Sequence, residues 1–256
     1  MSRLTELFLR KQQRVLNVYC TAGYPELEST LPVMRALQAH GADIIELGMP
    51  YSDPLADGPV IQASSARALQ NGMSIEILFA QLQQLRSNIT VPVVLMGYLN
   101  PLLQYGFDAF CAKAAACGVD GLIIPDIPLP AFEREYKDIV KRHGLDFIFL
   151  VTPETAEARL RQLDAASSGF LYAVSSSSVT GSATDFSQVA TYLQRLKELR
   201  LKNPVLVGFG IHNRETFDAA CQHANGAIIG SAYIRALADG NFVEETTASF
   251  LGSVLG

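Results

Sequence analysis

The chain has 256 residues, of which 49% are hydrophobic and 18% are charged, and its formal net charge is −5. This length suits a large α/β domain, and the acidic balance argues against nucleic-acid binding, which requires a basic face. The sequence contains no apolar run of the roughly 20 residues that a membrane span needs, and residues 1–14 lack the apolar stretch of a signal peptide. We therefore predict a cytoplasmic protein without a nucleic-acid or membrane partner.

The cysteines and histidines give no sign of a metal site. Four of each are spread along the chain without the close spacing of metal ligands. Free cysteines in apolar surroundings behave as small hydrophobic side chains. We predict no bound metal ion, and reduced structural thiols at Cys20, Cys111, Cys117 and Cys221.

Strand patterns and helix patterns alternate along the whole chain. Short, apolar, β-rich runs predict strands at residues 15–21, 43–47, 91–96, 120–124, 146–151, 170–174, 205–208 and 226–229. Apolar residues at helical spacing predict helices at residues 5–13, 27–40, 60–69, 75–86, 107–116, 131–142, 155–165, 188–199 and 214–223, with a final helical region to 251. Residues 97–106 are expected to form a loop.

This alternation indicates a parallel sheet with both faces covered. Eight strand–helix units in a chain of 256 residues fit a (β/α)8 TIM barrel. An open doubly wound sheet is the alternative, but residues 21–25, after the first strand, lack the glycine pattern that binds dinucleotides. We predict a single α/β barrel domain over residues 1–256, with an extra N-terminal helix and extra short helices after the second and eighth strands.

Acidic residues cluster where the second predicted strand ends. Glu46 lies at the strand end between apolar neighbours, which tend to raise a carboxyl pKa and so suit an acid and base. Asp53 and Asp57 follow in a loop where an aspartate is also typical of a turn. In a barrel all strand-to-helix loops meet at one rim, so these side chains are candidates for a site there.

Glycine-rich segments follow the last three predicted strands. They are Val179-Thr180-Gly181, Gly208-Phe209-Gly210-Ile211 and Gly230-Ser231. Backbone N–H groups beside a helix N-terminus bind a phosphate group without a cationic side chain. The alternative is that these glycines only allow tight turns. We predict a phosphate site.

Residues 46–62, with the sequence ELGMPYSDPLADGPVIQ, closely resemble the signature of the tryptophan synthase alpha subunit family. Further similar segments are TAGYP at 21–25, GYLNP at 97–101, PDIP at 125–128, SVTG at 178–181, GFGI at 208–211 and GSA at 230–232. The resemblance implies a (β/α)8 lyase of tryptophan biosynthesis that cleaves indole-3-glycerol phosphate to indole and glyceraldehyde 3-phosphate. It also implies no cofactor in this chain, and a β subunit partner that holds pyridoxal phosphate in an α2β2 heterotetramer.

The resemblance assigns roles to individual residues. Glu46 matches the catalytic glutamate, and Asp57 matches the aspartate that receives the indole N–H. Substrate contacts are implied for Tyr19, Tyr172, Thr180 and Phe209, and phosphate contacts for Gly181, Gly210, Gly230 and Ser231. A partner interface is implied for Asp53, Asn100 and Pro101. In the sixth strand's loop, Ser176 and Ser178 replace an arginine and a glycine of the family, so a side-chain cation near the phosphate is missing.

Two other readings compete with this one. An indole-glycerol-phosphate synthase or a sugar-phosphate isomerase or epimerase would also be a phosphate-binding barrel, but no predicted strand here ends in the lysine or histidine typical of them. A non-catalytic barrel that regulates a partner enzyme would not need the two carboxylates, and both Glu46 and Asp57 are present.

Overall fold

The strands of this computed structural model, which describes the chain except residues 175–185, 209 and 241, form one parallel sheet. They are β1 (Val15–Thr21), β2 (Ile44–Gly48), β3 (Val93–Met96), β4 (Gly121–Ile123), β5 (Asp146–Phe147), β6 (Leu150–Val151), β7 (Leu171–Ala173), β8 (Val205–Val207) and β9 (Gly226–Ile229). Their order is β5-β4-β3-β2-β1-β9-β8-β7-β6, and every neighbouring pair is parallel.

The two strands at the ends of this order close the sheet into a barrel. Only Ile148 and Phe149 separate β5 from β6. The N–H of Ile148 donates to Leu122 of β4 at 3.0 Å, whereas the carbonyl of Phe149 accepts from Tyr172 of β7 at 3.0 Å. Residues 146–151 therefore act as one strand with a neighbour on each side. The predicted (β/α)8 barrel is confirmed, and the single domain, which one continuous sheet supports, stays a prediction.

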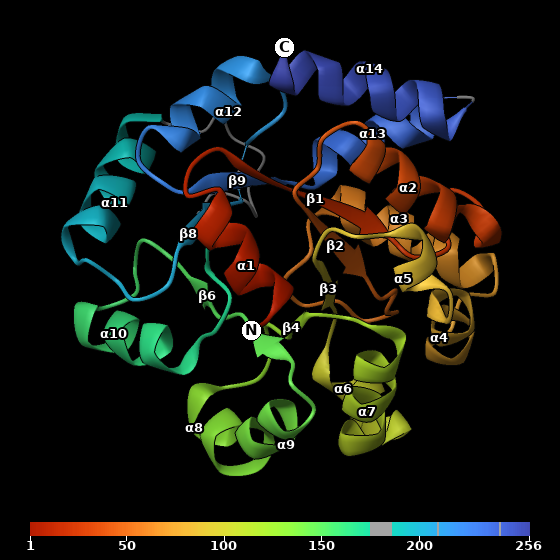
Figure 1. Cartoon of the computed structure of the whole chain (residues 1–256), viewed down its shortest axis with the longest axis horizontal. Coiled ribbons are helices and arrows are strands. Elements are labelled where there is room, and N and C mark those ends of the chain that lie inside the picture. The colour runs from red at the N-terminus through yellow and green to blue at the C-terminus, as the bar shows by residue number, and fades with distance from the viewer. Residues whose placement is uncertain (175–185, 209, 241) are drawn as a thin grey trace.

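Helices surround the strands (Figure 1). They are α1 (Arg3–Arg10), the 3-10 turn η1 (Leu27–Ser29), α2 (Thr30–Ala39), α3 (Pro59–Gln70), α4 (Ile75–Leu82), α5 (Leu85–Asn88), α6 (Leu99–Tyr105), α7 (Phe107–Cys117), α8 (Leu129–Ala131), the π-helical turn η2 (Phe132–Tyr136), α9 (Lys137–Arg142), α10 (Glu157–Ala166), α11 (Phe186–Glu198), α12 (Arg214–Cys221), α13 (Ser231–Asp239) and α14 (Val243–Leu255). The predicted extra helices are α1 before the barrel, α3 after β2 and α13 after β9.

Helix α6 was not predicted. The sequence around Pro101 reads as a loop, but Pro101 is the third residue of α6. The first four N–H groups of a helix have no intrahelical partner, so a proline there breaks no hydrogen bond. The N–H of Leu99 instead donates to the carboxylate of Asp126 at 3.0 Å. The prediction of a loop at 97–106 was therefore wrong for most of its length.

Side chains alternate between two apolar layers along each strand, as the period of two requires. On β1, Leu16 and Val18 pack in the layer between strands and helices, whereas Val15 packs in the barrel interior. Leu4, Leu7 and Phe8 of α1 belong to the same interior cluster. Figure 1 shows α1 in front of the strands, inside the ring of helices. Helix α1 therefore closes the end of the barrel at which the strands begin.

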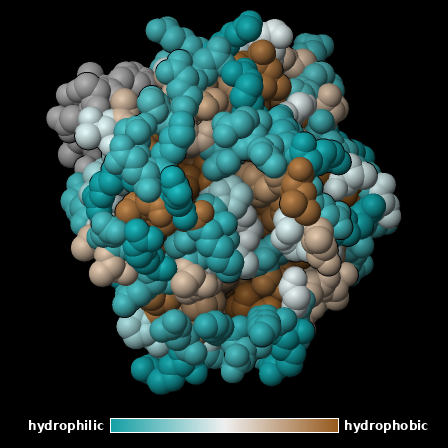
Figure 2. All heavy atoms as spheres, turned by 60° about the vertical axis from the view of Figure 1, so that its left-hand side comes forward, coloured by the Kyte–Doolittle hydropathy of each residue, from teal (hydrophilic) through white to brown (hydrophobic). Residues whose placement is uncertain are grey.

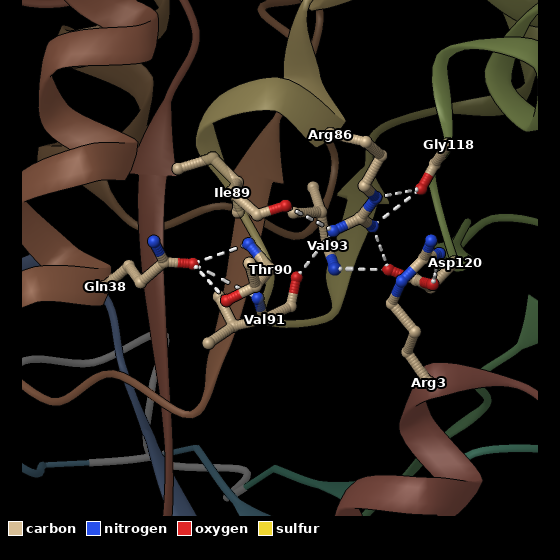
Figure 3. Close-up of polar contacts among 9 residues, drawn as sticks. All are labelled: Arg3, Gln38, Arg86, Ile89, Thr90, Val91, Val93, Gly118 and Asp120. Carbon is tan, nitrogen blue, oxygen red and sulfur yellow. Dashed lines mark hydrogen bonds and ion pairs between the residues drawn. The ribbon is translucent and has the colours of Figure 1, made fainter.

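A polar cluster fastens this amino-terminal end (Figure 3). The carboxylate of Asp120, just before β4, accepts hydrogen bonds from Arg3 of α1 at 2.9 Å and from the N–H of Val93 at 2.7 Å. Arg86 of α5 pairs with the same carboxylate and also donates to the carbonyls of Gly118, Ile89 and Val91. The side chain of Asp120 is only 3% exposed, but two guanidinium groups balance its charge.

None of the described helices is long and apolar enough to cross a bilayer. The face in Figure 2 is mostly hydrophilic, with hydrophobic side chains showing chiefly in its recesses.

Candidate functional site

A cavity of about 250 Å³ lies at the opposite end, where the strands end. It brings together most of the interior residues that the sequence singled out, namely Tyr19, Glu46, Asp57, Tyr172, Gly210, Gly230 and Ser231. Thr180, Gly181 and Phe209 lie outside the described residues. Asp53, Asn100 and Pro101 do not line the cavity.

Glu46 is the buried carboxyl of this cavity. It lies on β2 in register with Tyr19 of β1, and it is 1% exposed. Asn17 lies two residues before Tyr19 on β1, and its side chain points to the same face of the strand. Its Nδ2 donates to Glu46 Oε2 at 2.7 Å. Burial raises the pKa of Glu46 to about 8; the Asn17 hydrogen bond lowers it, and nearby Asp57 raises it further. Near neutral pH this carboxyl can therefore both donate and accept a proton.

Two tyrosine rings form walls of the cavity, and each has a glycine beside it. A Cβ atom on Gly48 would overlap the Tyr19 hydroxyl, and one on Gly208 would overlap the Tyr172 ring. Burial raises the pKa of both tyrosines above the ordinary 10, so both hydroxyls stay protonated near neutral pH and can donate hydrogen bonds.

Asp57 enters the cavity from the loop after β2. Burial raises its pKa, and a hydrogen bond with the Tyr98 hydroxyl opposes that shift. The Tyr98 hydroxyl also accepts the N–H of Ala56 at 3.0 Å, and Gln62 Nε2 donates to the Asp57 carbonyl at 2.7 Å. Tyr98 therefore holds the loop that presents Asp57 and favours the ionised form of its carboxyl.

The loops after β8 and β9 form the other side of the cavity. Gly230 is the N-cap of α13, and Ser231 and Ala232 begin the helix, so their N–H groups precede the first intrahelical donor, Ile234. Gly210 has a φ of 63°, which favours glycine, and its carbonyl accepts from His212 Nδ1 at 2.7 Å. Free amide groups at a helix N-terminus attract an anion.

Sequence reasoning missed Arg235, which lines the same cavity. It is one helical turn after Ser231, and long helical side chains lean toward the N-terminus of their helix. Arg235 forms no ion pair with any residue that the structure describes. The spacing of four residues from the Gly-Ser segment is the signal that would have found it.

The residues expected at a partner interface lie on the surface outside the cavity. Asp53 and Asn100 are exposed, and Asn100 Nδ2 donates to the Tyr51 hydroxyl at 3.1 Å. Leu55, in the same loop as Asp53, is 84% exposed.

The cavity chemistry is that of acid–base groups and hydrogen-bond donors. Within the described ranges, no group of three or more histidine, cysteine, aspartate or glutamate side chains is arranged to hold a metal ion.

Comparison with known proteins identifies close relatives over nearly the whole chain. The family model of the tryptophan synthase alpha chain matches residues 7–251. The tryptophan synthase alpha chain of Flavobacterium johnsoniae is 52% identical over 240 residues, which cover 93% of this chain and 94% of the relative. That of Parabacteroides distasonis is 51% identical over 238 residues, covering 93% of each.

Solved structures of tryptophan synthase chains superpose on this chain over nearly its whole length. Tryptophan synthase subunit alpha from Legionella pneumophila superposes with a TM-score of 0.90 at 33% identity, over 99% of this chain and 97% of that one. A chain of the tryptophan synthase complex from Pyrococcus furiosus has a TM-score of 0.86 at 35% identity, over 96% of this chain and 99% of that one.

Proposed function

Because this chain belongs to the tryptophan synthase alpha chain family, and is a lyase of tryptophan biosynthesis, we propose that its cavity cleaves indole-3-glycerol phosphate with Glu46 and Asp57 as the reacting carboxyl groups. The products are indole and glyceraldehyde 3-phosphate. The observation that carries these roles is a buried carboxyl with a pKa of about 8 in a cavity that also holds a helix N-terminus.

Glu46 moves two protons in this mechanism. Its protonated carboxyl first gives a proton to C3 of the indole ring. The resulting carboxylate then takes the proton of the glycerol C3′ hydroxyl, the O–H electron pair becomes the aldehyde π bond, and the C3–C3′ bond breaks. The electrons of that bond return to the indole ring, and Glu46 ends as it began. One carboxyl suffices because its pKa of about 8 is close to neutral pH.

Asp57 stabilises the charge that the first step creates. Protonation at C3 makes the indole ring cationic, and an ionised carboxylate at the ring N–H stabilises that cation in the transition state. Burial raises the pKa of Asp57, but the Tyr98 hydrogen bond opposes that shift, and the negative charge of Asp57 raises the pKa of Glu46, so the two carboxyls divide the work. Glu46 carries protons, whereas Asp57 stays charged.

The phosphate group is proposed to bind at the start of α13. The N–H groups of Gly230, Ser231 and Gly210 are suited to it, and Tyr172 lines the same cavity. Ser176 and Ser178 stand where the family often has an arginine and a glycine, so that arginine is not available to the phosphate. Arg235 of α13 supplies a positive charge instead. We propose that Thr180 contacts the substrate, that Gly181 contacts its phosphate group and that Phe209 contacts the indole ring.

We also propose that the surface around Asp53, Asn100 and Pro101 binds a tryptophan synthase β subunit in an α2β2 assembly. The exposure of Asp53, Asn100 and Leu55 beside the cavity supports this. Pyridoxal phosphate then belongs to the β subunit, and this chain needs no cofactor of its own. The cytoplasmic location stays a prediction.

Indole release is the direct test. The purified chain should form indole and glyceraldehyde 3-phosphate in equal amounts from indole-3-glycerol phosphate, slowly alone and faster with an added β subunit. The chain contains no tryptophan, so indole fluorescence can be followed with little protein background. Failure to form indole under either condition would refute the proposal, and would favour a regulatory barrel if the β subunit were nevertheless activated.

A further inference from the structure

Asn17 is a buried amide at an unusual place in the barrel interior. It is fully buried, and its neighbours in register are Ile44 on β2 and Ile228 on β9. Its Oδ1 atom has no hydrogen-bond partner among the described residues. An unsatisfied buried polar atom destabilises the folded state. Folding alone would therefore favour an aliphatic side chain at this position.

Among the described residues, the side chain that Asn17 hydrogen-bonds is that of Glu46. Asn17 Nδ2 donates to Glu46 Oε2 at 2.7 Å, and both side chains are closed to solvent. Asn17 does not line the cavity, whereas Glu46 does. An N–H donor requires Oε2 to stay an acceptor, so the proton of neutral Glu46 must reside on the other oxygen, Oε1.

We propose that Asn17 is a positioning residue that fixes the rotamer of Glu46 and keeps the transferable proton on Oε1. The amide also favours the carboxylate that forms after the first proton transfer, because a hydrogen bond to a charged acceptor is stronger than one to a neutral acceptor. This inference rests on the proposed acid–base role of Glu46. It gives Asn17 no contact with the substrate.

Several titratable groups surround this pair. Tyr19 and Cys20 of β1, Tyr172 of β7 and Asp57 all interact with Glu46, and Arg235 and His212 line the same cavity. Burial holds the pKa of Tyr19, Cys20 and Tyr172 above their ordinary values. These three groups therefore stay neutral near neutral pH, and a titration close to pH 8 belongs to Glu46 rather than to them.

The test is Asn17→Leu, a change of similar size that removes the donor. Loss of the donor raises the Glu46 pKa further above 8, because the Asn17 hydrogen bond lowers it in the native protein. We expect kcat to fall about tenfold with KM nearly unchanged, and the alkaline limb of the rate profile to move up by about one pH unit. Thermal stability should change little, because the unsatisfied Oδ1 of Asn17 is removed while Glu46 Oε2 loses its hydrogen-bond donor.

Two controls separate this proposal from others. Asn225→Ala removes a half-buried amide that bonds Val205 and Gln12 near the amino-terminal end, and it should lower stability without moving the pH profile. Asn17→Ser restores a small donor and should recover part of kcat. The Glu46 carboxyl is also followed without turnover, by the infrared C=O band that Glu46→Gln removes. If the wild type is active but Asn17→Leu leaves the infrared band of Glu46 and the pH profile of the rate unchanged, the role of Asn17 is overturned. If the wild type is inactive, the proposed function is refuted instead.

Discussion

The two ends of the barrel each bury a carboxyl group, but they treat it differently. Asp120 at the amino-terminal end, with its side chain 3% exposed, meets two arginines and a backbone N–H. Glu46 at the other end, 1% exposed, has one neutral amide as its side-chain partner in the part of the chain that the structure describes, and its pKa is raised to about 8. The ion pairs of Asp120 connect α1, α5 and β4. Glu46 has no such ion pair among the described residues, so burial raises its pKa and it can take up a proton near neutral pH.

The largest loss of stability is expected from disrupting the ion pairs of Asp120 at the amino-terminal end. Asp120→Ala leaves Arg86 without its partner carboxylate and removes the acceptor of Val93. Removing one partner of a buried ion pair destabilises strongly, and because Arg3 and Arg86 keep some contact with solvent we expect a loss of about 2–4 kcal/mol in the free energy of unfolding. Urea denaturation measures this loss.

The matched control is Asp108→Ala, which removes an exposed carboxylate that also pairs with two side chains, Arg142 and His143. It should leave the urea midpoint unchanged. The folded fraction of Asp120→Ala should keep near-native kcat, since Asp120 is far from the cavity chemistry. A large fall in kcat at unchanged stability would contradict the division between the two ends.

A smaller effect is expected at the cavity end, from removing the charge of Arg235. Arg235→Gln should raise KM for indole-3-glycerol phosphate about tenfold and leave kcat within about twofold, because the contact that we propose for Arg235 is with the phosphate in ground state and transition state alike. Inorganic phosphate should inhibit the variant more weakly than the wild type. Steady-state kinetics measure both changes.

Arg67→Gln is the control for charge alone. Arg67 lies on α3 and pairs with Glu26 outside the cavity, so its removal should leave KM unchanged. Equal effects of the two variants would point to long-range attraction of the substrate rather than to a phosphate contact.

The sequence predicted the barrel and its rim because strand periodicity is local. The runs at β1 and β9 are predicted to the residue, and Glu46 stands out as an acid within an apolar strand. The motif around Glu46 and Asp57 came from resemblance, and the roles of these residues stay predictions. Helix α6 was missed because Pro101 is tolerated in a first turn.

The polar partners inside the barrel were beyond sequence reasoning. Asn17 and Glu46 are 29 positions apart, and their contact depends on the register of β1 against β2. A shift of one residue would turn Asn17 into the outer layer. Arg235 was missed for a similar reason, since its place in the cavity follows from where α13 begins. Register and helix ends are set by packing over the whole barrel.

Turnover by Glu46→Gln is the most direct test of the proton-transfer role of Glu46. Glutamine keeps the size of Glu46 and can accept the Asn17 hydrogen bond, but it cannot transfer a proton. We expect indole release to fall by at least about 1000-fold while the dissociation constant of indole-3-glycerol phosphate, measured by calorimetry, changes little. Near-native indole release by this variant would contradict the assignment of Glu46 as the group that carries the protons.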